Sequence, residues 1–287
     1  MAEKVFLNGR LVDIPGASVS VADGGLLYGA GLFETMRVHN GVVFALEDHL
    51  DRLFFSAKVL SINITCDRQY ITSALYKVLQ ANQLSDARIR LTVTTGPMSE
   101  PDEQRKSTLL ITATALKPYP PQYYQKGVTV ILCPYRQNPN DPTCGHKVTS
   151  FFSRMMALKV AHQKGAAEAL WFTPDSRLAE GCISNVFLVK DSTLYTPPIS
   201  TPVLAGVARR TICQIAADAS IELIEKNLYI DDVLSAEEIF LTNVIMQVMP
   251  VSGVEKHTVG DGKVGPVTKK LKERFEEFVE RQCGKDK

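Results

Sequence analysis

A proline-rich stretch near the middle of the chain limits how its strands and helices can be arranged. Residues 117–126 read KPYPPQYYQK, with three prolines within four residues. Proline lacks the N–H group that a helix interior or a central strand uses, so neither is expected to run through this segment. The segment predicts an interdomain linker between a small N-terminal α/β domain, residues 1–116, and a larger C-terminal domain, residues 127–287.

Strand and helix patterns occur on both sides of this linker. Asn8-Gly9 and Asn40-Gly41, each between short apolar runs, predict two hairpins with primed turns. Apolar residues at helical spacing and alternating apolar residues predict the remaining elements. Helices are expected over residues 46–60, 70–80, 151–164 and 211–219 and near the C-terminus, and strands over 87–95, 109–116, 128–132, 169–172, 186–189, 194–195, 238–241 and 244–251.

Composition narrows the class of protein. Of 287 residues, 45% are hydrophobic and 22% charged, with a net charge of +1, which is typical of a globular protein and does not suggest binding to nucleic acid or to a membrane surface. The N-terminus has no signal-peptide pattern. Six scattered cysteines without a C-x-x-C pair predict free thiols in a reducing cytoplasm. The five histidines show no metal-site spacing, so no metal is expected.

Two charged residues carry the first chemical hypothesis. Lys147 lies in GHKVTS ahead of a predicted helix, and Glu180 lies in LAEGCISNVFLV beside a predicted strand. An amine nucleophile can hold pyridoxal 5'-phosphate covalently, and a carboxylate can pair with the cofactor's pyridinium nitrogen. Each residue taken alone is more simply explained as a solvated surface charge.

Three other segments could bind a phosphate group. LAGVARRTI, residues 204–212, opens a helix whose first N–H groups could bind an anion, although a plain strand-to-helix turn with a glycine explains this stretch more simply when it is taken alone. Thr242-Asn243 interrupts an apolar run and could add donors, although a capped turn is the commoner structure. Arg52 could bind phosphate in a bidentate manner, or pair with Asp48 or Asp51. The glycine-dense GGLLYGAG, residues 24–31, predicts only a tight turn or a close backbone approach.

Together these segments resemble the class IV, or fold-type IV, pyridoxal-phosphate enzymes. This family includes branched-chain and D-amino acid aminotransferases and 4-amino-4-deoxychorismate lyases. The resemblance runs nearly end to end, through VFLNGRLV, YGAGLFETMRVHNG, LEDHLDRLFFSA, the HK segment, LAEGCISNVFLVKDSTLYTPP, LAGVARR, FLTNVIMQVMPV and DGKVGPVTKKLKERFE. It implies an α/β (α+β) fold of two domains, like that of D-amino acid aminotransferase, pyridoxal 5'-phosphate as cofactor, and a homodimer.

The resemblance also assigns roles to single residues. Lys147 matches the catalytic lysine that forms a Schiff base with the cofactor. Glu180 matches the carboxylate at the pyridine nitrogen, and Arg52 the arginine that binds the phosphate. Leu204 matches the residue that packs on the cofactor ring.

Further matches concern the phosphate and the ring hydroxyl. Val207 and Ala208 match backbone phosphate donors at a helix start, and Asn243 and Val244 match the last phosphate-binding loop. Val244 departs from a frequent threonine, so only its backbone can contribute. Phe152 replaces a tyrosine that contacts the cofactor's hydroxyl in branched-chain enzymes.

The reaction depends on the substrate pocket. GLFETMR, ARIRLTVTTG, YRQNP, EGCISNVF and TNVIMQVMPV look closest to aminodeoxychorismate lyases of folate biosynthesis, which release pyruvate and 4-aminobenzoate. We expect Tyr28, Phe33, Thr35 and Arg90 or Arg136 to line the pocket, where arginines would suit a dicarboxylate. Ordinary surface arginines are an equal alternative.

Two other functions stay open. One is transamination of a branched-chain or other amino acid with a 2-oxo acid acceptor. The other, more distant, is a non-catalytic binding protein with this fold. The D-amino acid enzymes carry an Arg-x-His carboxylate trap where this chain has Glu100-Pro101-Asp102, which argues against their activity.

Overall fold

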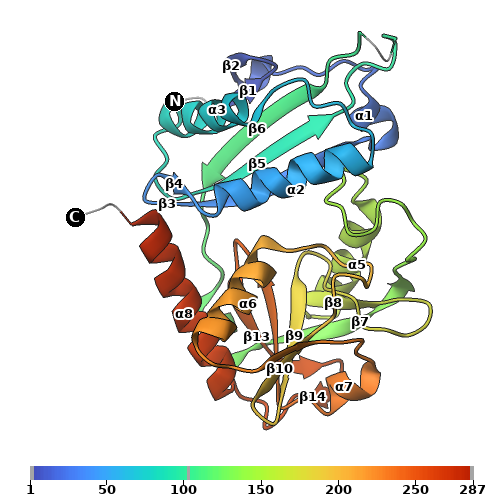
Figure 1. Cartoon of the computed structure of the whole chain (residues 1–287), viewed down its shortest axis with the longest axis vertical. Coiled ribbons are helices and arrows are strands. Elements are labelled where there is room, and N and C mark those ends of the chain that lie inside the picture. The colour runs from blue at the N-terminus through green and yellow to red at the C-terminus, as the bar shows by residue number, and fades with distance from the viewer. Residues whose placement is uncertain (1–2, 102–103, 285–287) are drawn as a thin grey trace. The chain divides into compact units, whose positions relative to one another are not determined.

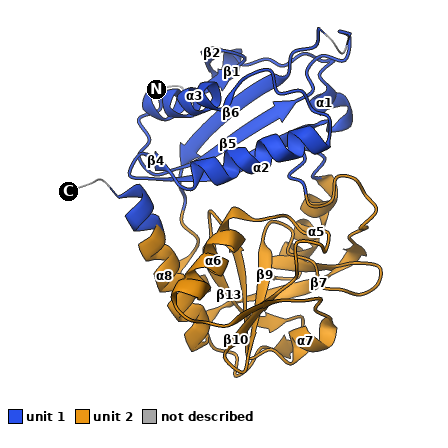
Figure 2. Cartoon of the chain, viewed as in Figure 1, with its two compact units in different colours: residues 1–117, 146–151, 279–287 blue, residues 118–145, 152–278 orange. Residues whose placement is uncertain are grey.

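The chain divides into two compact units. The computed structural model describes residues 3–101 and 104–284, so Asp102 in the segment compared with the D-amino acid enzymes lies outside the described residues. Unit 1 comprises residues 1–117, 146–151 and 279–287, and unit 2 comprises residues 118–145 and 152–278 (Figure 2). Unit 1 thus includes two segments from the predicted C-terminal domain, and residues 146–151 contain Lys147.

Unit 1 is built on an antiparallel sheet. The strand order is β2-β1-β6-β5-β3-β4 (Figure 1). Both predicted hairpins are confirmed, and Asn8 and Asn40 adopt φ angles of 47° and 53°, as the first central residue of a type I′ turn requires. The strands are β1 (Lys4–Leu7), β2 (Arg10–Asp13), β3 (Gly31–His39), β4 (Val42–Val43), β5 (Ala87–Thr94) and β6 (Thr108–Ala115).

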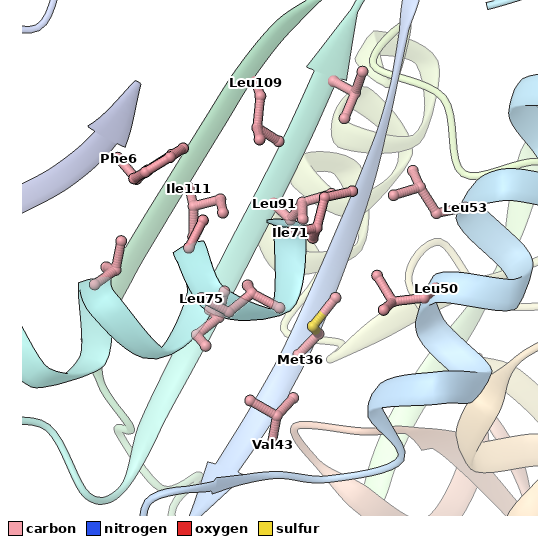
Figure 3. Packing of buried hydrophobic residues seen from close by; sticks show 14 of the residues in the cluster. Phe6, Met36, Val43, Leu50, Leu53, Ile71, Leu75, Leu91, Leu109 and Ile111 are labelled. Carbon is pink, nitrogen blue, oxygen red and sulfur yellow. The ribbon is translucent and has the colours of Figure 1, made fainter. Parts of the chain in front are cut away.

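Two amphipathic helices bury one face of this sheet. Helices α2 (Leu46–Val59) and α3 (Arg68–Ala81) match the predicted segments closely. Their apolar faces pack with strand residues in one cluster that includes Met36, Leu50, Leu75, Leu91 and Ile111 (Figure 3). Side chains alternate between the two faces of a strand, so Glu34 points to the helix side with Met36, whereas Phe33 and Thr35 point to the opposite face.

The glycine-dense segment forms a short helix that sequence patterns did not indicate. Helix α1 (Gly24–Tyr28) is capped by Asp23 and ends at Gly29, which has a left-handed conformation with φ 66°. A Cβ atom on Gly29 would lie 2.9 Å from Cβ of Ser150, and one on Gly31 would lie 2.7 Å from the carbonyl oxygen of Val93. The predicted close backbone approach is therefore confirmed. A 3-10 helix, η1 (Ile14–Gly16), precedes α1.

Unit 2 contains a mixed sheet. Its order is β11-β10-β9-β12-β13-β7-β8, with β14 paired to β13, and the β13–β7, β7–β8 and β10–β11 pairs are parallel. The strand expected to start at residue 244 starts at Gln247, because residues 244–246 form the turn between β12 and β13. The strands are β7 (Val128–Arg136), β8 (Glu168–Phe172), β9 (Asn185–Lys190), β10 (Thr193–Thr196), β11 (Leu223–Glu225), β12 (Glu238–Asn243), β13 (Gln247–Val254) and β14 (His257–Thr258).

Two helices differ from the sequence expectation. Helix α4 (Pro121–Lys126) occupies six of the ten residues of the predicted linker, because Pro121 takes the first helical position, where proline is tolerated. Helix α6 (Val207–Asp218) begins four residues before the predicted start at Thr211. The other helices are α5 (Phe152–Gln163), α7 (Ile230–Leu234) and α8 (Pro266–Cys283).

Several classes of feature are absent from the described residues. Within residues 3–101 and 104–284, no cluster of three or more His, Cys, Asp or Glu side chains could hold a metal ion. No helix in the same ranges is long and apolar enough to cross a membrane. All six cysteines are free thiols, as predicted.

Candidate active site

Backbone pairing with β3 holds Lys147 in unit 1. The Phe33 N–H donates to the Lys147 carbonyl at 2.9 Å, and the Thr149 N–H donates to the Gly31 carbonyl at 2.8 Å. The Thr149 hydroxyl also donates to the Gly29 carbonyl at 2.6 Å. The segment that carries the lysine is therefore fixed along the first residues of β3 by hydrogen bonds at Lys147 and at Thr149.

The Phe33 ring connects Lys147 to a predicted substrate residue. Nζ of Lys147 lies 4.6 Å from the ring centroid, and Cζ of Arg90 lies 3.7 Å from it. Thr35 is the cross-strand partner of Arg90 in the β3–β5 pair. Three of the predicted substrate residues thus lie with the candidate catalytic amine on the sheet face opposite the helices.

Arg90 has properties of an anion-binding group. Within the described part of the chain, its guanidinium makes no hydrogen bond or ion pair, and it lies over the Phe33 ring. Partial burial, followed by repulsion from Arg88, lowers the pKa of Arg90. A desolvated guanidinium without a carboxylate partner binds an incoming carboxylate more strongly than a hydrated one does.

Arg52 belongs to a buried cluster on the helix side of the sheet. Its Nε and Nη2 atoms donate to Glu34 at 2.8 and 2.5 Å, and Nδ1 of His49 lies 2.7 Å from the same carboxylate. Burial alone would raise the pKa of Glu34, but the charge and hydrogen bonds of Arg52 and the hydrogen bond of His49 lower it to about 2. Arg52 therefore pairs with Glu34, whereas Asp51 pairs with Arg68.

Glu180 lies in unit 2, in a short segment that pairs with the end of β8. The Trp171 N–H donates to the Glu180 carbonyl at 2.7 Å, and the carboxylate is buried. Its Oε2 accepts from the Leu204 N–H at 2.9 Å, and its Oε1 accepts from Nη2 of Arg154 at 2.5 Å. The structure thus brings Glu180 next to the predicted ring-packing residue Leu204, and adds an arginine.

The predicted phosphate segment follows Leu204 directly. Helix α6 begins at Val207 with Gly206 as N-cap, a residue without a side chain to cap it, so Val207 and Ala208 present their N–H groups at an open helix start. A Cβ atom on Gly206 would overlap Oδ1 of Asn185. The Asn185 amide in turn donates to the Leu204 carbonyl at 2.9 Å.

Asn243 caps the turn after β12. Its Oδ1 accepts from the N–H groups of Ile245 and Met246, both at 2.9 Å, and its amide donates to the Ile183 carbonyl at 3.1 Å. The buried Thr242 hydroxyl has no hydrogen-bond partner among the described residues. The Val244 side chain is buried, so only its backbone is left for a phosphate.

The remaining candidates are exposed or lie in unit 2. Tyr28 is exposed at the end of α1, and Phe152 is 77% exposed at the start of α5. Arg136 lies in unit 2, where it donates to the backbone carbonyls of Cys133 and Tyr135. Burial raises the pKa of the Cys144 thiol to about 11, which excludes a reactive thiolate at neutral pH.

Three residues of these clusters were missed in the sequence. Glu34 forms an ion pair with Arg52, and Arg154 forms one with Glu180. Glu168, on β8, accepts from the Ile183 N–H at 2.5 Å and from the Ser184 hydroxyl. Glu34 had a detectable signal, since a charged residue at an inward position of an apolar strand needs a partner. Arg154 and Glu168 had none, because their partners are distant in sequence.

Comparison with known proteins decides the family. The model of the family described as amino-transferase class IV matches residues 31–254. A Methanocaldococcus jannaschii protein named "Putative branched-chain-amino-acid aminotransferase" is 35% identical over 279 residues, covering 96% of each chain. The chain belongs to the class IV aminotransferase family.

Solved structures agree with this membership. A T.th. branched-chain amino acid aminotransferase with pyridoxamine 5'-phosphate aligns with a TM-score of 0.91 at 27% identity, over 97% of this chain and 94% of that one. A 4-amino-4-deoxychorismate lyase of Pseudomonas aeruginosa aligns with a TM-score of 0.85 at 29% identity, over 95% and 98%. This class IV aminotransferase-family protein therefore has the α/β fold of fold-type IV enzymes and is a pyridoxal-phosphate-dependent enzyme.

Each unit, taken by itself, holds groups that fit a part of this cofactor. Unit 2 offers a buried carboxylate at Glu180, the open start of α6 and the Thr242 hydroxyl, which suit a ring nitrogen and a phosphate. Unit 1 offers the Lys147 amine beside an aromatic ring.

Proposed function

We propose that this enzyme is a 4-amino-4-deoxychorismate lyase, which releases pyruvate and forms 4-aminobenzoate for folate biosynthesis. Lys147 is the catalytic residue. Glu180 holds the ring nitrogen of pyridoxal 5'-phosphate, Leu204 packs on the ring, and Arg52 binds the phosphate. The N–H groups of Val207, Ala208 and Val244 and the Asn243 turn complete the phosphate site.

The Arg90 guanidinium carries this proposal. It lies over the same Phe33 ring as the Lys147 amine, so a carboxylate bound to Arg90 would be held near the catalytic amine. Aminodeoxychorismate has a carboxylate on its ring and another on its enolpyruvyl group. The aliphatic side chain of a branched-chain amino acid substrate, bound in the same place, would leave the Arg90 guanidinium desolvated and unpaired, which costs free energy.

The chemistry assigned to Lys147 is proton transfer. Its Nζ takes the proton from the carbon that bears the substrate's amino group. When bound, pyridoxal phosphate withdraws the electron pair that this proton leaves behind. The C–O bond between the substrate ring and the enolpyruvyl oxygen then breaks, so that the ring becomes aromatic and the enolate of pyruvate leaves. This enolate takes up one proton, equal to the one that Nζ removed, and becomes pyruvate. Phe33 keeps water from one side of the amine, and Thr35 and Tyr28 complete the substrate pocket.

Transamination is the second candidate, supported by the 35% identical relative named as a branched-chain aminotransferase. Glutamate, a common amino donor, would also present a carboxylate to Arg90. A transaminase moves the abstracted proton to a second carbon instead of expelling a leaving group. The same site residues serve both reactions, so the substrate decides between them.

Two further proposals concern the cellular form. We propose a homodimer in the cytoplasm, consistent with the family resemblance and with six free thiols. Sedimentation of the holoenzyme at micromolar concentration tests the dimer, and a single monomer boundary would contradict it.

A pair of assays tests the reaction. Purified holoenzyme is incubated with aminodeoxychorismate, and 4-aminobenzoate and pyruvate are measured. A parallel reaction contains amino acids with 2-oxoglutarate, and glutamate is measured. Equimolar 4-aminobenzoate and pyruvate support the lyase, whereas glutamate alone would replace it with transamination.

Arg90→Gln tests the proposed role of Arg90 in binding the substrate. It is expected to raise KM about ten-fold or more, and Arg88→Gln, an exposed neighbour on the same strand, is the matched control.

The Lys147 assignment has its own test. Borohydride should fix the cofactor to Lys147 and bleach the visible band, and peptide mapping locates the modified residue. Lys147→Ala should bind cofactor without a reducible bond. A reducible bond that persists in this variant would show that another amine is the nucleophile.

A further inference from the structure

Both oxygens of the Glu180 carboxylate already accept hydrogen bonds from the protein. Oε1 accepts from Nη2 of Arg154 at 2.5 Å, and Oε2 accepts from the Leu204 N–H at 2.9 Å. The Glu180 side chain is 5% exposed. A carboxylate that is also to bond a ring nitrogen therefore shares its negative charge with a guanidinium.

Arg154 is held in this place by the loop that carries Glu180. On α5, its Nη1 donates to the Gly181 carbonyl at 2.9 Å, and its Nη2 donates to Oε1 of Gln137 at 2.9 Å. Its guanidinium lies 5.4 Å from the Trp171 ring. Burial opposes the charged form, but the charge and hydrogen bond of Glu180 raise the pKa of Arg154 above its usual value, so it stays positive.

A guanidinium beside a carboxylate cancels much of the negative potential that a third group would feel. A ring nitrogen at such a carboxylate holds its proton less firmly than one at a carboxylate without a cationic partner. We propose that Arg154 is a positioning residue that lowers the protonation of the cofactor's ring nitrogen by sharing the Glu180 carboxylate. This inference rests on the role of Glu180 proposed above.

The proposal has a consequence for the reaction. A protonated ring withdraws electrons strongly, and a less protonated ring does so less strongly. When the ring withdraws electrons less strongly, a leaving group on the substrate can take the electron pair instead. Elimination then competes better with transamination, in which the proton moves to a second carbon. Arg154 thus favours loss of pyruvate over transfer of the amino group.

Nitrogen NMR of holoenzyme loaded with ring-¹⁵N pyridoxal phosphate measures ring protonation directly. Spectra are recorded from pH 6 to 9 for the wild type, Arg154→Met, Arg154→Lys and the control Arg274→Met, which removes an exposed arginine of the same unit. Removal of the Arg154 charge should raise the ratio of protonated to unprotonated ring on the order of ten-fold, because a unit charge within about 5 Å shifts a pKa by at least one unit. Arg154→Lys and Arg274→Met should stay near the wild type. In Arg154→Met, the ratio of amino-group transfer to pyruvate release should also rise.

The outcomes separate this inference from the role of Glu180. An unchanged ring signal in folded, cofactor-loaded Arg154→Met would overturn it. Should that variant not fold, a wild-type ring that stays fully protonated from pH 6 to 9 would overturn it equally. Glu180→Gln should abolish the dependence of the ring signal on Arg154. If Glu180→Gln changes neither the ring signal nor cofactor affinity, the proposed role of Glu180 itself is wrong.

Discussion

Nδ1 of His49 lies 2.7 Å from Oε2 of Glu34, and both side chains are buried. Arg52 bonds the same carboxylate through two nitrogens. Burial, together with the Lys147 and Arg52 charges, lowers the pKa of His49 against the effect of Glu34, so its imidazole is neutral at pH 7. The orientation of Arg52, the proposed phosphate ligand, is therefore set by a carboxylate on the neighbouring strand.

Glu34→Gln should destabilise the protein and weaken cofactor binding. The amide leaves Arg52, a side chain only 10% exposed, without this charge partner, and breaking a buried pair costs about 3 kcal/mol or more. Urea unfolding measures the loss, and cofactor titration measures affinity. Glu47→Gln is the control on the same helix. Glu47 is exposed and lies 3.5 Å from the exposed Arg68, so its replacement should change the free energy of unfolding by less than about 0.5 kcal/mol. Equal effects of the two variants would contradict the special role of Glu34.

The hairpins and amphipathic helices of unit 1 could be predicted because their signals are local. Asn-Gly turns and the 3.6-residue spacing of apolar residues act within one element. Helix α1 could not, since its glycines disfavour a helix and its start depends on the Asp23 cap. Helix α4 was hidden because proline excludes a helix interior but fits its first turn.

The candidate site likewise contains residues that the sequence indicates and residues that it does not. Lys147 and Glu180 are predicted from motifs, and the proximity of Phe33, Thr35 and Arg90 follows from strand alternation and the β3–β5 register. The Arg154–Glu180 pair and the position of Glu168 depend on tertiary contacts between segments up to 26 residues apart. No periodic pattern indicates such contacts, and a basic residue on a helix normally faces solvent.

His39 should make stability depend on pH around neutrality. Its ring lies between Asp86 at 2.8 Å and Glu280 at 2.6 Å; partial burial lowers its pKa, but hydrogen bonds to these carboxylates raise it overall. A raised pKa contributes stability that is full below the unfolded value near 6.5 and is lost as pH rises through the folded value. Urea unfolding of His39→Asn should therefore show a larger loss relative to wild type at pH 5.5 than at pH 9. His162→Asn, on exposed helix surface, is the control. A loss independent of pH would show that the contacts act without the charge.

The pKa of Glu168 is shifted upward, whereas that of Glu34 is shifted downward. Burial raises the pKa of Glu168 to about 7, despite hydrogen bonds from Ser184 and Ile183. Because the unfolded carboxyl ionises near 4.5, its contribution is full below that pH and is lost as pH rises to 7, by about 3 kcal/mol in total. Glu168→Gln should flatten this loss, so that unfolding at pH 5 and pH 8 differs less than in wild type. The exposed Glu237→Gln should keep the wild-type dependence, and an unchanged profile in Glu168→Gln would refute the assignment.

Gly206→Ala should impair the cofactor site through packing alone. The backbone of Gly206, with φ −67°, accepts alanine without strain, but the new Cβ would overlap Oδ1 of Asn185. Asn185 must then move, which disturbs its hydrogen bond to Leu204, the residue whose N–H holds Glu180. We expect cofactor affinity to fall about ten-fold or more, since one lost polar contact is worth roughly 1.4 kcal/mol. Gly253→Ala in the same unit meets no atom closer than 3.5 Å and should bind normally. Equal affinities of the two variants in a cofactor titration would show that Asn185 does not support the start of α6.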